Sequence, residues 1–179
     1  EHPFLPRRQP TNPRRRFIYH TCQNVGAFLN ALRAAPIGPG PPPGIHNYHR
    51  GGDLRVYDQD IRRALGQIGN EVDTEAIMRI WTKACHSHWA ANPVWVHGDI
   101  ARTNILTEGH HLCGVIDFGC CTVGDPACDL TIAWTFFQDD ARQAFIETVN
   151  YDPDTWARAR GWAVWKAALQ IAQGDQIGQ

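Results

Sequence analysis

The sequence of 179 residues contains very little lysine and serine, and it lacks any long hydrophobic run. Lysine occurs twice, at Lys83 and Lys166, and Ser87 is the single serine. Because no run of 18 apolar residues occurs, no membrane-spanning helix is expected. No G-x-S-x-G surrounds Ser87, which argues against a serine hydrolase of that type. The Gly/Pro-rich run at 38–44 is no phosphate-cradling loop, because its prolines lack N–H groups and no G-K-S/T follows.

Net charge is also small, at −1, so no global field favours nucleic acid or a membrane surface as a partner. Residues 1–16 are an exception, with five arginines against one glutamate. Their four prolines and low apolar content predict a disordered or extended leader, with a nucleic-acid-binding arm as the alternative. Residues 17–179 are then expected to form one domain.

Two motifs at a fixed spacing carry the chemistry. His97-Gly98-Asp99 with Asn104 forms H-x-D-x4-N, and Asp117 begins D-F-G further along the chain. Phosphoryl transfer needs one carboxylate near the attacking hydroxyl, and Asp99 fits that role as catalytic base. It also needs a carboxylate and an amide oxygen to hold Mg²⁺ on the nucleotide phosphates, and Asp117 and Asn104 fit those roles.

The periodicity of apolar residues predicts a mainly helical chain with a small β-element at these motifs. Val94–Val96 is expected to be a strand that leads into the loop of His97 and Asp99. Two apolar runs, 104–107 and 112–116, are expected to form a hairpin that leads to Asp117. Helices are expected at 17–34, 53–65, 73–90, 125–137, 139–149 and 154–173.

The chain resembles the aminoglycoside phosphotransferase family of small-molecule kinases. The resemblance rests on VHGDIARTNIL (96–106), GVIDFGCCTVGDPACDLTIAW (114–134) and GWAVWKA (161–167), and it covers roughly residues 17–170. Gly98 and the Gly-Asp-Pro-x-x-Asp at 124–129 are typical of this family rather than of protein kinases. The implied fold is α+β: the mainly helical C-terminal lobe of a protein-kinase-like fold, with a β-hairpin at the catalytic site.

The resemblance implies an O-phosphotransferase that uses ATP or GTP and Mg²⁺ on a small hydroxylated acceptor such as an aminoglycoside. It implies that Asp129 accepts backbone N–H groups of the catalytic loop. His97 is expected to hold that loop by hydrogen bonds, with direct acid–base catalysis as the alternative. Arg102 either reaches the transferred phosphoryl group or pairs elsewhere on the surface.

The small N-terminal β-lobe of such kinases is not recognisable in the sequence. That lobe supplies a phosphate-binding Lys, whereas Lys83 lies in an expected helix and Lys166 in the last one. We therefore expect the large lobe of a truncated, processed or degenerate kinase. Such a chain is expected to be inactive alone, and to self-associate or to bind a missing-lobe partner. A non-catalytic pseudokinase-like domain and one half of a split kinase are the alternatives.

A polycationic acceptor would favour a carboxylate-lined pocket. Five acidic residues after the D-F-G could line one, or could form a solvated helical face: Asp139, Asp140, Glu147, Asp152 and Asp154.

Six cysteines occur without a C-x2-C pair, so buried reduced thiols and a cytoplasmic location are expected. A zinc site at His110, His111, Cys113 and Cys120 is a weaker interpretation, because the D-F-G already accounts for this stretch.

Overall fold

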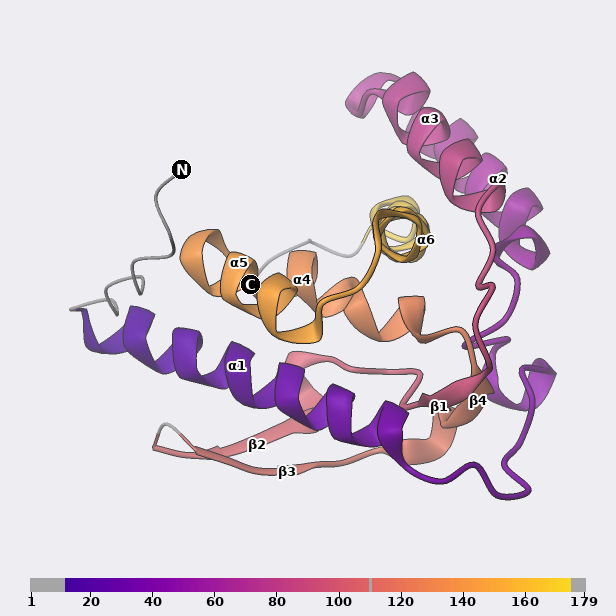
Figure 1. The fold of residues 1–179 in the computed structure, drawn as a ribbon. Helices are drawn as coiled ribbons and strands as arrows, with labels where there is room; N and C mark the ends of the chain where they lie inside the picture. Colours follow the sequence, from indigo (N-terminus) through magenta and orange to yellow (C-terminus); the bar gives the residue numbers. More distant parts are fainter. Residues whose placement is uncertain (1–11, 110, 175–179) are drawn as a thin grey trace, which may run out of the picture.

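The computed structural model describes residues 12–109 and 111–174, and its helices lie in layers over two small sheets (Figure 1). Helix α1, Pro13–Ala34, begins four residues before the predicted start at residue 17. Residues 13–16 of the predicted leader are therefore helical, and residues 1–11 lie outside the described residues.

Helix α1 packs along helix α5, Asp139–Val149. The two backbones approach closely, because a Cβ on Gly26 would lie 2.7 Å from Cγ2 of Thr148. Asn30 Nδ2 donates to the Thr148 carbonyl at 2.8 Å and fixes the register of the pair. This contact joins the first helix to an element more than a hundred residues away.

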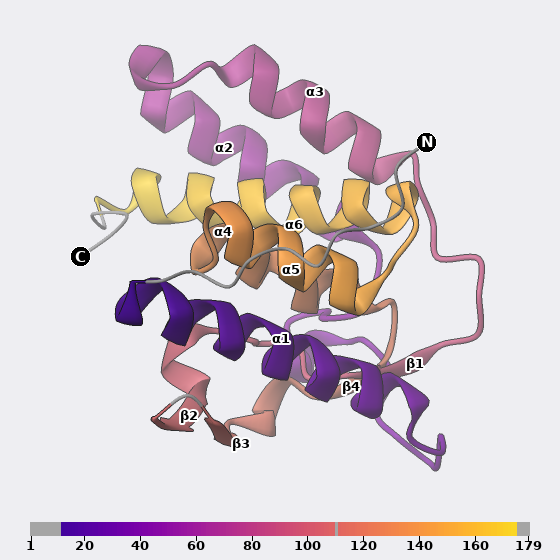
Figure 2. The same cartoon turned by 60° about the vertical axis from the view of Figure 1, so that its left-hand side comes forward.

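Helix α6, Pro153–Ala172, lies between this layer and a layer formed by α2 and α3 (Figure 2). Asp53 caps the 3₁₀ helix η2, Leu54–Tyr57, that leads into α2, Asp58–Ile68. Asp73 caps α3, Thr74–Cys85, by accepting from Ala76 N–H. Both caps are Asp side chains that satisfy otherwise unpaired N–H groups of the first turn.

Helix α3 ends at Cys85, so the prediction that it continues to residue 90 is wrong. Ser87 consequently lies outside the helix, where its hydroxyl accepts from Arg158 Nη1 at 2.6 Å and donates to the Asp154 carbonyl at 3.2 Å. These contacts with α6 hold the chain in an irregular path that leads to the first strand.

Two antiparallel pairs of strands lie beside the motifs. Strand β2, Ile105–Glu108, pairs with β3, His111–Val115, as the predicted hairpin. Strand β1, Val94–Val96, pairs with β4, Thr122–Gly124, a pairing that the sequence analysis did not predict. Because β1 leads into the H-x-D loop and β4 follows the D-F-G, this pairing brings the two motifs together.

The segment after β4 begins with Asp125 as N-cap, which accepts from Ala127 N–H at 3.1 Å. It forms a 3₁₀ helix η6, Pro126–Thr131, followed by a short α4, Ile132–Thr135, where one helix was predicted. Fully buried side chains that include Trp81, Phe137, Phe145 and Trp162 form the core between these layers.

The predicted α+β, mainly helical fold class is confirmed. Within residues 12–93 the structure has helices and turns but no strand. Of the helices in the described ranges, none has the length and apolarity needed to cross a membrane.

Candidate active site

The catalytic loop runs from His97 to Asn104 and is held from below by a buried carboxylate. Asp129 is 3% exposed, and its two oxygens accept from the backbone N–H groups of His97 and Gly98, each at 2.8 Å. This is the contact that the resemblance implied for Asp129. Burial raises the pKa of Asp129 to about 6, although both N–H groups and Lys166 oppose the shift.

Gly98 is required by the path of this loop. Its φ is +85°, and a Cβ at this position would lie 2.3 Å from the carbonyl oxygen of Cys120. Any other residue would therefore be strained and would push the loop away from the segment after the D-F-G.

His97 is fully buried and joins the two motifs. Its Nε2 lies 3.1 Å from the carbonyl oxygen of Ile116, and its Nδ1 accepts from the Asp99 N–H at 3.2 Å. These partners assign the proton to Nε2. Burial lowers the pKa of His97, so the ring is held neutral. With both nitrogens engaged, the geometry favours a positioning role over acid–base catalysis.

Asp99 stands at the surface of the loop, with 36% of its side chain exposed. Lys166 from α6 is paired with it, at 3.2 Å between Nζ and Oδ1. Asn104 Nδ2 donates to the Asp99 carbonyl at 2.9 Å and lies 3.4 Å from its Oδ2. A carboxylate has about four lone-pair sites, so Asp99 can still accept a hydrogen bond from an incoming hydroxyl.

Asn104 and Asp117 lie at the same end of the β2–β3 hairpin. The carbonyl of Asn104 accepts from the N–H of Ile116 at 3.0 Å, directly before Asp117. Because Nδ2 of Asn104 donates to Asp99, its Oδ1 is the side-chain atom left to accept a ligand. An amide oxygen and an exposed carboxylate are hard donors of the kind that Mg²⁺ prefers, so the residues fit the ion.

Two protein ligands suffice for such a site, since Mg²⁺ usually keeps waters and binds substrate phosphates. Over residues 12–109 and 111–174, no three His, Cys, Asp or Glu side chains are grouped closely enough to hold a metal ion on their own. Asp117 also has φ +66°, a left-handed conformation that costs energy for a residue other than glycine. The strained backbone therefore coincides with the candidate metal ligand.

Arg102 lies in the 3₁₀ helix η4, Arg102–Asn104, and is exposed. Its guanidinium lies 5.8 Å from the ring centroid of Phe136, which is one of the residues that line a pocket of about 430 Å³. The contact with a transferred phosphoryl group stays a prediction.

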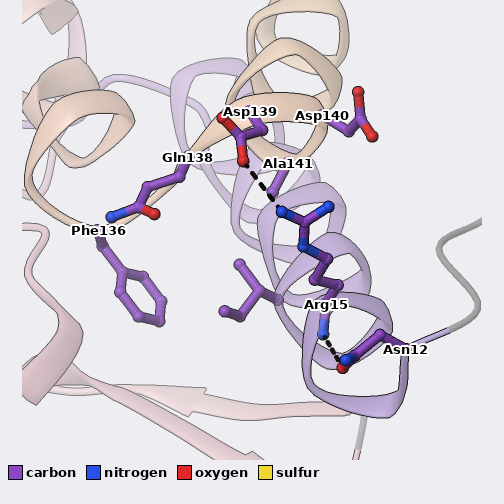
Figure 3. A pocket seen from close by; sticks show the side chains of 8 residues that line it. Asn12, Arg15, Phe136, Gln138, Asp139, Asp140 and Ala141 are labelled. Carbon is purple, nitrogen blue, oxygen red and sulfur yellow. Dashed lines mark hydrogen bonds and ion pairs between the residues drawn. The ribbon is translucent and has the colours of Figure 1, made fainter.

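The pocket beside Phe136 contains two of the five acidic residues that could line an acceptor site. Figure 3 shows Asp139 of α5 directed toward Arg15 of α1, with which it is paired at 3.5 Å. Asp140 lies at the rim of the same pocket. Asp152 instead caps α6 through the N–H groups of residues 154 and 155. The five carboxylates therefore do not converge on one pocket.

A second buried network joins α6 to the segment after β4 and to the segment after α3. Arg158 of α6 donates through Nε to Asp125 at 2.6 Å, through Nη1 to Ser87 at 2.6 Å and through Nη2 to Thr155 at 3.0 Å. Burial raises the pKa of Asp125, and Arg158 opposes the shift. Asp125 is thus both the N-cap and a buried ion-pair partner.

All six cysteines are free thiols, but only Cys22 and Cys128 are fully buried, and Cys113 is exposed. The expectation that the thiols are buried is therefore wrong for most of them. Burial raises the pKa of Cys22 to about 12, so this thiol is unreactive.

Sequence reasoning missed the roles of Lys166 and Arg158. Lys166 lies 67 positions from Asp99, and no local pattern connects them. Its only signal was its rarity, because it is one of two lysines in the chain.

A family model described as the phosphotransferase enzyme family, APH, matches residues 2–162. Among curated proteins, none matches the sequence. A solved streptomycin–ATP–APH(2")-IIa ternary complex superposes with a TM-score of 0.54 at 19% identity, over 87% of this chain and 56% of that one. ADP-bound APH(2'')-Ib superposes with a TM-score of 0.52 at 18% identity, over 91% of this chain and 59% of that one.

At such low identity these likenesses show the fold alone, and the chain spans somewhat more than half the length of either structure. The family model, in contrast, covers most of the sequence and includes both motifs. On that ground the chain belongs to the phosphotransferase enzyme family.

Proposed function

We propose that this chain carries the catalytic lobe of an O-phosphotransferase that transfers the terminal phosphoryl group of ATP, or GTP, to a small hydroxylated molecule. One observation carries the proposal: Asp99, Asn104 and Asp117 are brought to one end of the hairpin by direct hydrogen bonds between the two motifs. The family membership supports the same reaction class. An aminoglycoside is the acceptor that the resemblance suggests.

Asp99 would accept a hydrogen bond from the acceptor hydroxyl and orient it. As the hydroxyl oxygen forms its bond to the terminal phosphorus, its proton passes to the Asp99 carboxylate, and the bond to the nucleoside diphosphate breaks. Lys166 restrains the Asp99 side chain from the α6 side. Asn104 and Asp117 would hold Mg²⁺, which neutralises charge on the phosphates when it is bound.

Apolar surface beside the candidate metal ligands could accommodate the base of the nucleotide. Leu106 and Ile116 lie at the same end of the hairpin and are 46% and 44% exposed. Phe118 of the D-F-G is 45% exposed. Exposed apolar side chains beside polar ligands are a common arrangement at cofactor sites.

The three intact site residues favour a catalytic lobe over a non-catalytic binding domain. Neither lysine of the chain occupies a strand before His97, so we expect the 179-residue chain alone to transfer phosphoryl groups poorly. A small lobe supplied by another chain, or a second copy, is a candidate partner. The free thiols suit a cytoplasmic location.

Mg²⁺-dependent nucleotide binding to the full chain tests the proposal. Calorimetric titration of ATP with and without Mg²⁺ should show that Mg²⁺ strengthens binding, and Asp117→Ala should abolish the Mg²⁺ effect. The matched control is Glu75→Ala, which removes an exposed carboxylate from α3. Binding that ignores Mg²⁺, or an Asp117→Ala variant that behaves like the control, would contradict the assignment.

A further inference from the structure

Arg50 is a buried cation without a counter-ion among the described residues. The residue is 8% exposed, and its guanidinium carbon lies 5.1 Å from the ring centroid of Trp162 and 5.2 Å from that of Trp165. Among the described residues, no acceptor lies within hydrogen-bonding distance of its Nε or Nη1. No carboxylate in the described ranges is paired with it either.

The two tryptophans beside Arg50 also have buried hydrogen-bond donors that lack a partner among the described residues. The indole Nε1 atoms of Trp162 and Trp165 are buried and lack an acceptor in the part of the chain that the structure describes. These two atoms and the two Arg50 nitrogens are all hydrogen-bond donors. Buried polar groups normally find partners, and unpaired ones cost free energy. A group of donors with no acceptor is therefore complementary to a species rich in acceptor oxygens.

Arg158 shows that the chain can satisfy a buried arginine when its role is structural. It is 5% exposed, similar to Arg50, but its guanidinium donates to Asp125, Ser87 and Thr155. Burial alone therefore does not explain why Arg50 has no partner.

The position of Arg50 is fixed by the backbone around it. Its N–H donates to the Asn47 carbonyl at 3.1 Å, and buried Asn47 donates to the Pro42 carbonyl at 3.0 Å. The next residue, Gly51, accepts from the Asp125 N–H at 2.8 Å. The backbone is therefore fixed on both sides of Arg50, and its guanidinium lies against two indole rings of α6, an arrangement that is preorganised for a ligand.

Arg50 and Lys166 lie in the same neighbourhood as the catalytic carboxylate. Lys166 follows Trp165 directly and is paired with Asp99. Burial raises the pKa of the Cys120 thiol. The thiol also lies within the electrostatic influence of Arg50 and Lys166, which oppose the shift, and of Asp99 and Asp117, which add to it. Lys166 is 25% exposed, so this neighbourhood has access to solvent.

We propose that Arg50 and Lys166 form an oxyanion-binding site, next to Asp99, for a carboxylate or phosphate group of the acceptor molecule. This rests on the proposed function and refines its substrate class. The candidate metal ligands belong to the hairpin end, whereas Arg50 and Lys166 belong to α6 and the segment packed on it. Because both cations lie on α6 or against it, the acceptor would approach Asp99 from the α6 side.

The proposal distinguishes between acceptor classes. A polycationic acceptor would be repelled by two positive side chains beside the attacking hydroxyl. A small hydroxylated acid, such as a sugar acid or a sugar phosphate, would instead pair with Arg50, whose planar group suits carboxylate and phosphate oxygens. It would share Lys166 with Asp99 and place a hydroxyl near that carboxylate.

Anion binding to the full 179-residue chain, without nucleotide or Mg²⁺, tests this proposal. Gluconate, inorganic phosphate and streptomycin are titrated at constant ionic strength while the indole N–H signals are followed by ¹H–¹⁵N NMR. The variants Trp162→Phe and Trp165→Phe assign the two signals. We expect gluconate and phosphate to shift the Trp162 and Trp165 signals saturably, and streptomycin to leave them unchanged.

Variants test whether the side chains of Arg50 and Lys166 bind the anion. Arg50→Met and Lys166→Gln should each weaken gluconate binding about tenfold or more, since each loses a charged hydrogen-bond donor. Arg55→Gln, an exposed arginine of η2, is the matched control and should keep the wild-type affinity. If far-UV circular dichroism shows that Arg50→Met does not fold, the gluconate affinity of Lys166→Gln decides whether the proposed site exists.

The proposal is overturned if neither anion shifts these signals saturably, if Lys166→Gln binds as tightly as Arg55→Gln, or if streptomycin gives the saturable shift. Its failure is separable from failure of the proposed function, because that function is tested by Mg²⁺-dependent ATP binding through Asp117. If anions bind but ATP binding does not depend on Mg²⁺, the oxyanion-binding site is supported and the kinase assignment is rejected.

Discussion

Arg50 and Arg158 are buried to nearly the same degree, at 8% and 5% exposure, yet their surroundings differ. Arg158 donates to Asp125, Ser87 and Thr155, which come from three separate segments. Arg50 lies against two indole rings with two of its nitrogens unpaired among the described residues. The comparison separates a buried charge that is paired within the fold from a buried charge that has no counter-ion among the described residues.

The same contrast exists among the carboxylates around the candidate catalytic loop. Asp129 is buried and satisfied by two backbone N–H groups. Asp99 and Asp117 are exposed or partly exposed, and Asp117 has a left-handed backbone. The buried carboxylate is fully hydrogen-bonded, whereas the two carboxylates that we propose to act on substrates remain accessible to solvent, as such a role requires.

Arg158→Met should produce the largest loss of stability. The substitution keeps the apolar volume but leaves Asp125 as a buried carboxylate without its partner, which typically costs about 3–5 kcal/mol. Urea unfolding followed by tryptophan fluorescence measures it. The double variant with Asp125→Asn should recover part of the loss, because it removes the unpaired charge. A loss below about 1 kcal/mol would show that this pair does not hold the fold together.

Asp129→Asn should change how stability depends on pH. Burial raises the pKa of Asp129 from 3.8 to about 6 in the folded state. Between these values the folded state binds more protons than the unfolded state, so stability falls as pH rises from about 4 to about 6. The shift corresponds to a loss of about 3 kcal/mol, and the asparagine variant should not show it.

Unfolding free energies of wild type and Asp129→Asn at pH 4 and pH 6.5 test this expectation. Subtracting the unfolding free energy of the variant from that of wild type removes the contribution of the other carboxyl groups, because their pKa shifts affect both proteins equally. A difference that is constant across this range would show that the two N–H groups outweigh burial and keep Asp129 ionised.

The sequence predicted contacts between residues that lie close together along the chain, and it did not predict contacts between residues that are far apart along the chain. Asp99, Asn104 and Asp117 lie within one short stretch, so their spacing alone identified them as a candidate set. The hairpin was predicted for the same reason. Lys166 and Asp99, in contrast, meet only because α6 crosses behind the catalytic loop, and no periodicity reports such a crossing.

The early end of α3 illustrates the same limit. Apolar spacing continued to Trp89, yet Ser87 leaves the helix to bind Arg158, 71 positions away. Here a tertiary hydrogen bond overrides the local helical pattern. Likewise, a helix was expected at 154–173, but no local pattern indicated that Arg50 would lie against it.

Asp99→Asn should have a small effect on stability and a large one on phosphoryl transfer. Its ion pair with Lys166 is 25% and 36% exposed, so solvent screening limits its worth to about 0.5 kcal/mol. In a preparation with measurable turnover, kcat should fall by about 10²–10⁴. Mg²⁺–ATP affinity of the full chain should stay within about twofold, in contrast to Asp117→Ala. Unchanged turnover would remove Asp99 from the role of base.

Arg50→Met should have a small effect on stability, although Arg50 is nearly as buried as Arg158. The variant loses contacts with two indole rings, each worth about 1–2 kcal/mol when shielded from water. It also removes a buried charge with unpaired donors, whose desolvation costs several kcal/mol. These opposing changes should leave the unfolding free energy within about 1 kcal/mol of wild type, or raise it. Urea unfolding followed by far-UV circular dichroism, beside Arg158→Met, measures the difference without depending on the fluorescence of Trp162 and Trp165. A loss as large as that of Arg158→Met would mean that Arg50 stabilises the fold, and would remove the distinction between the two arginines.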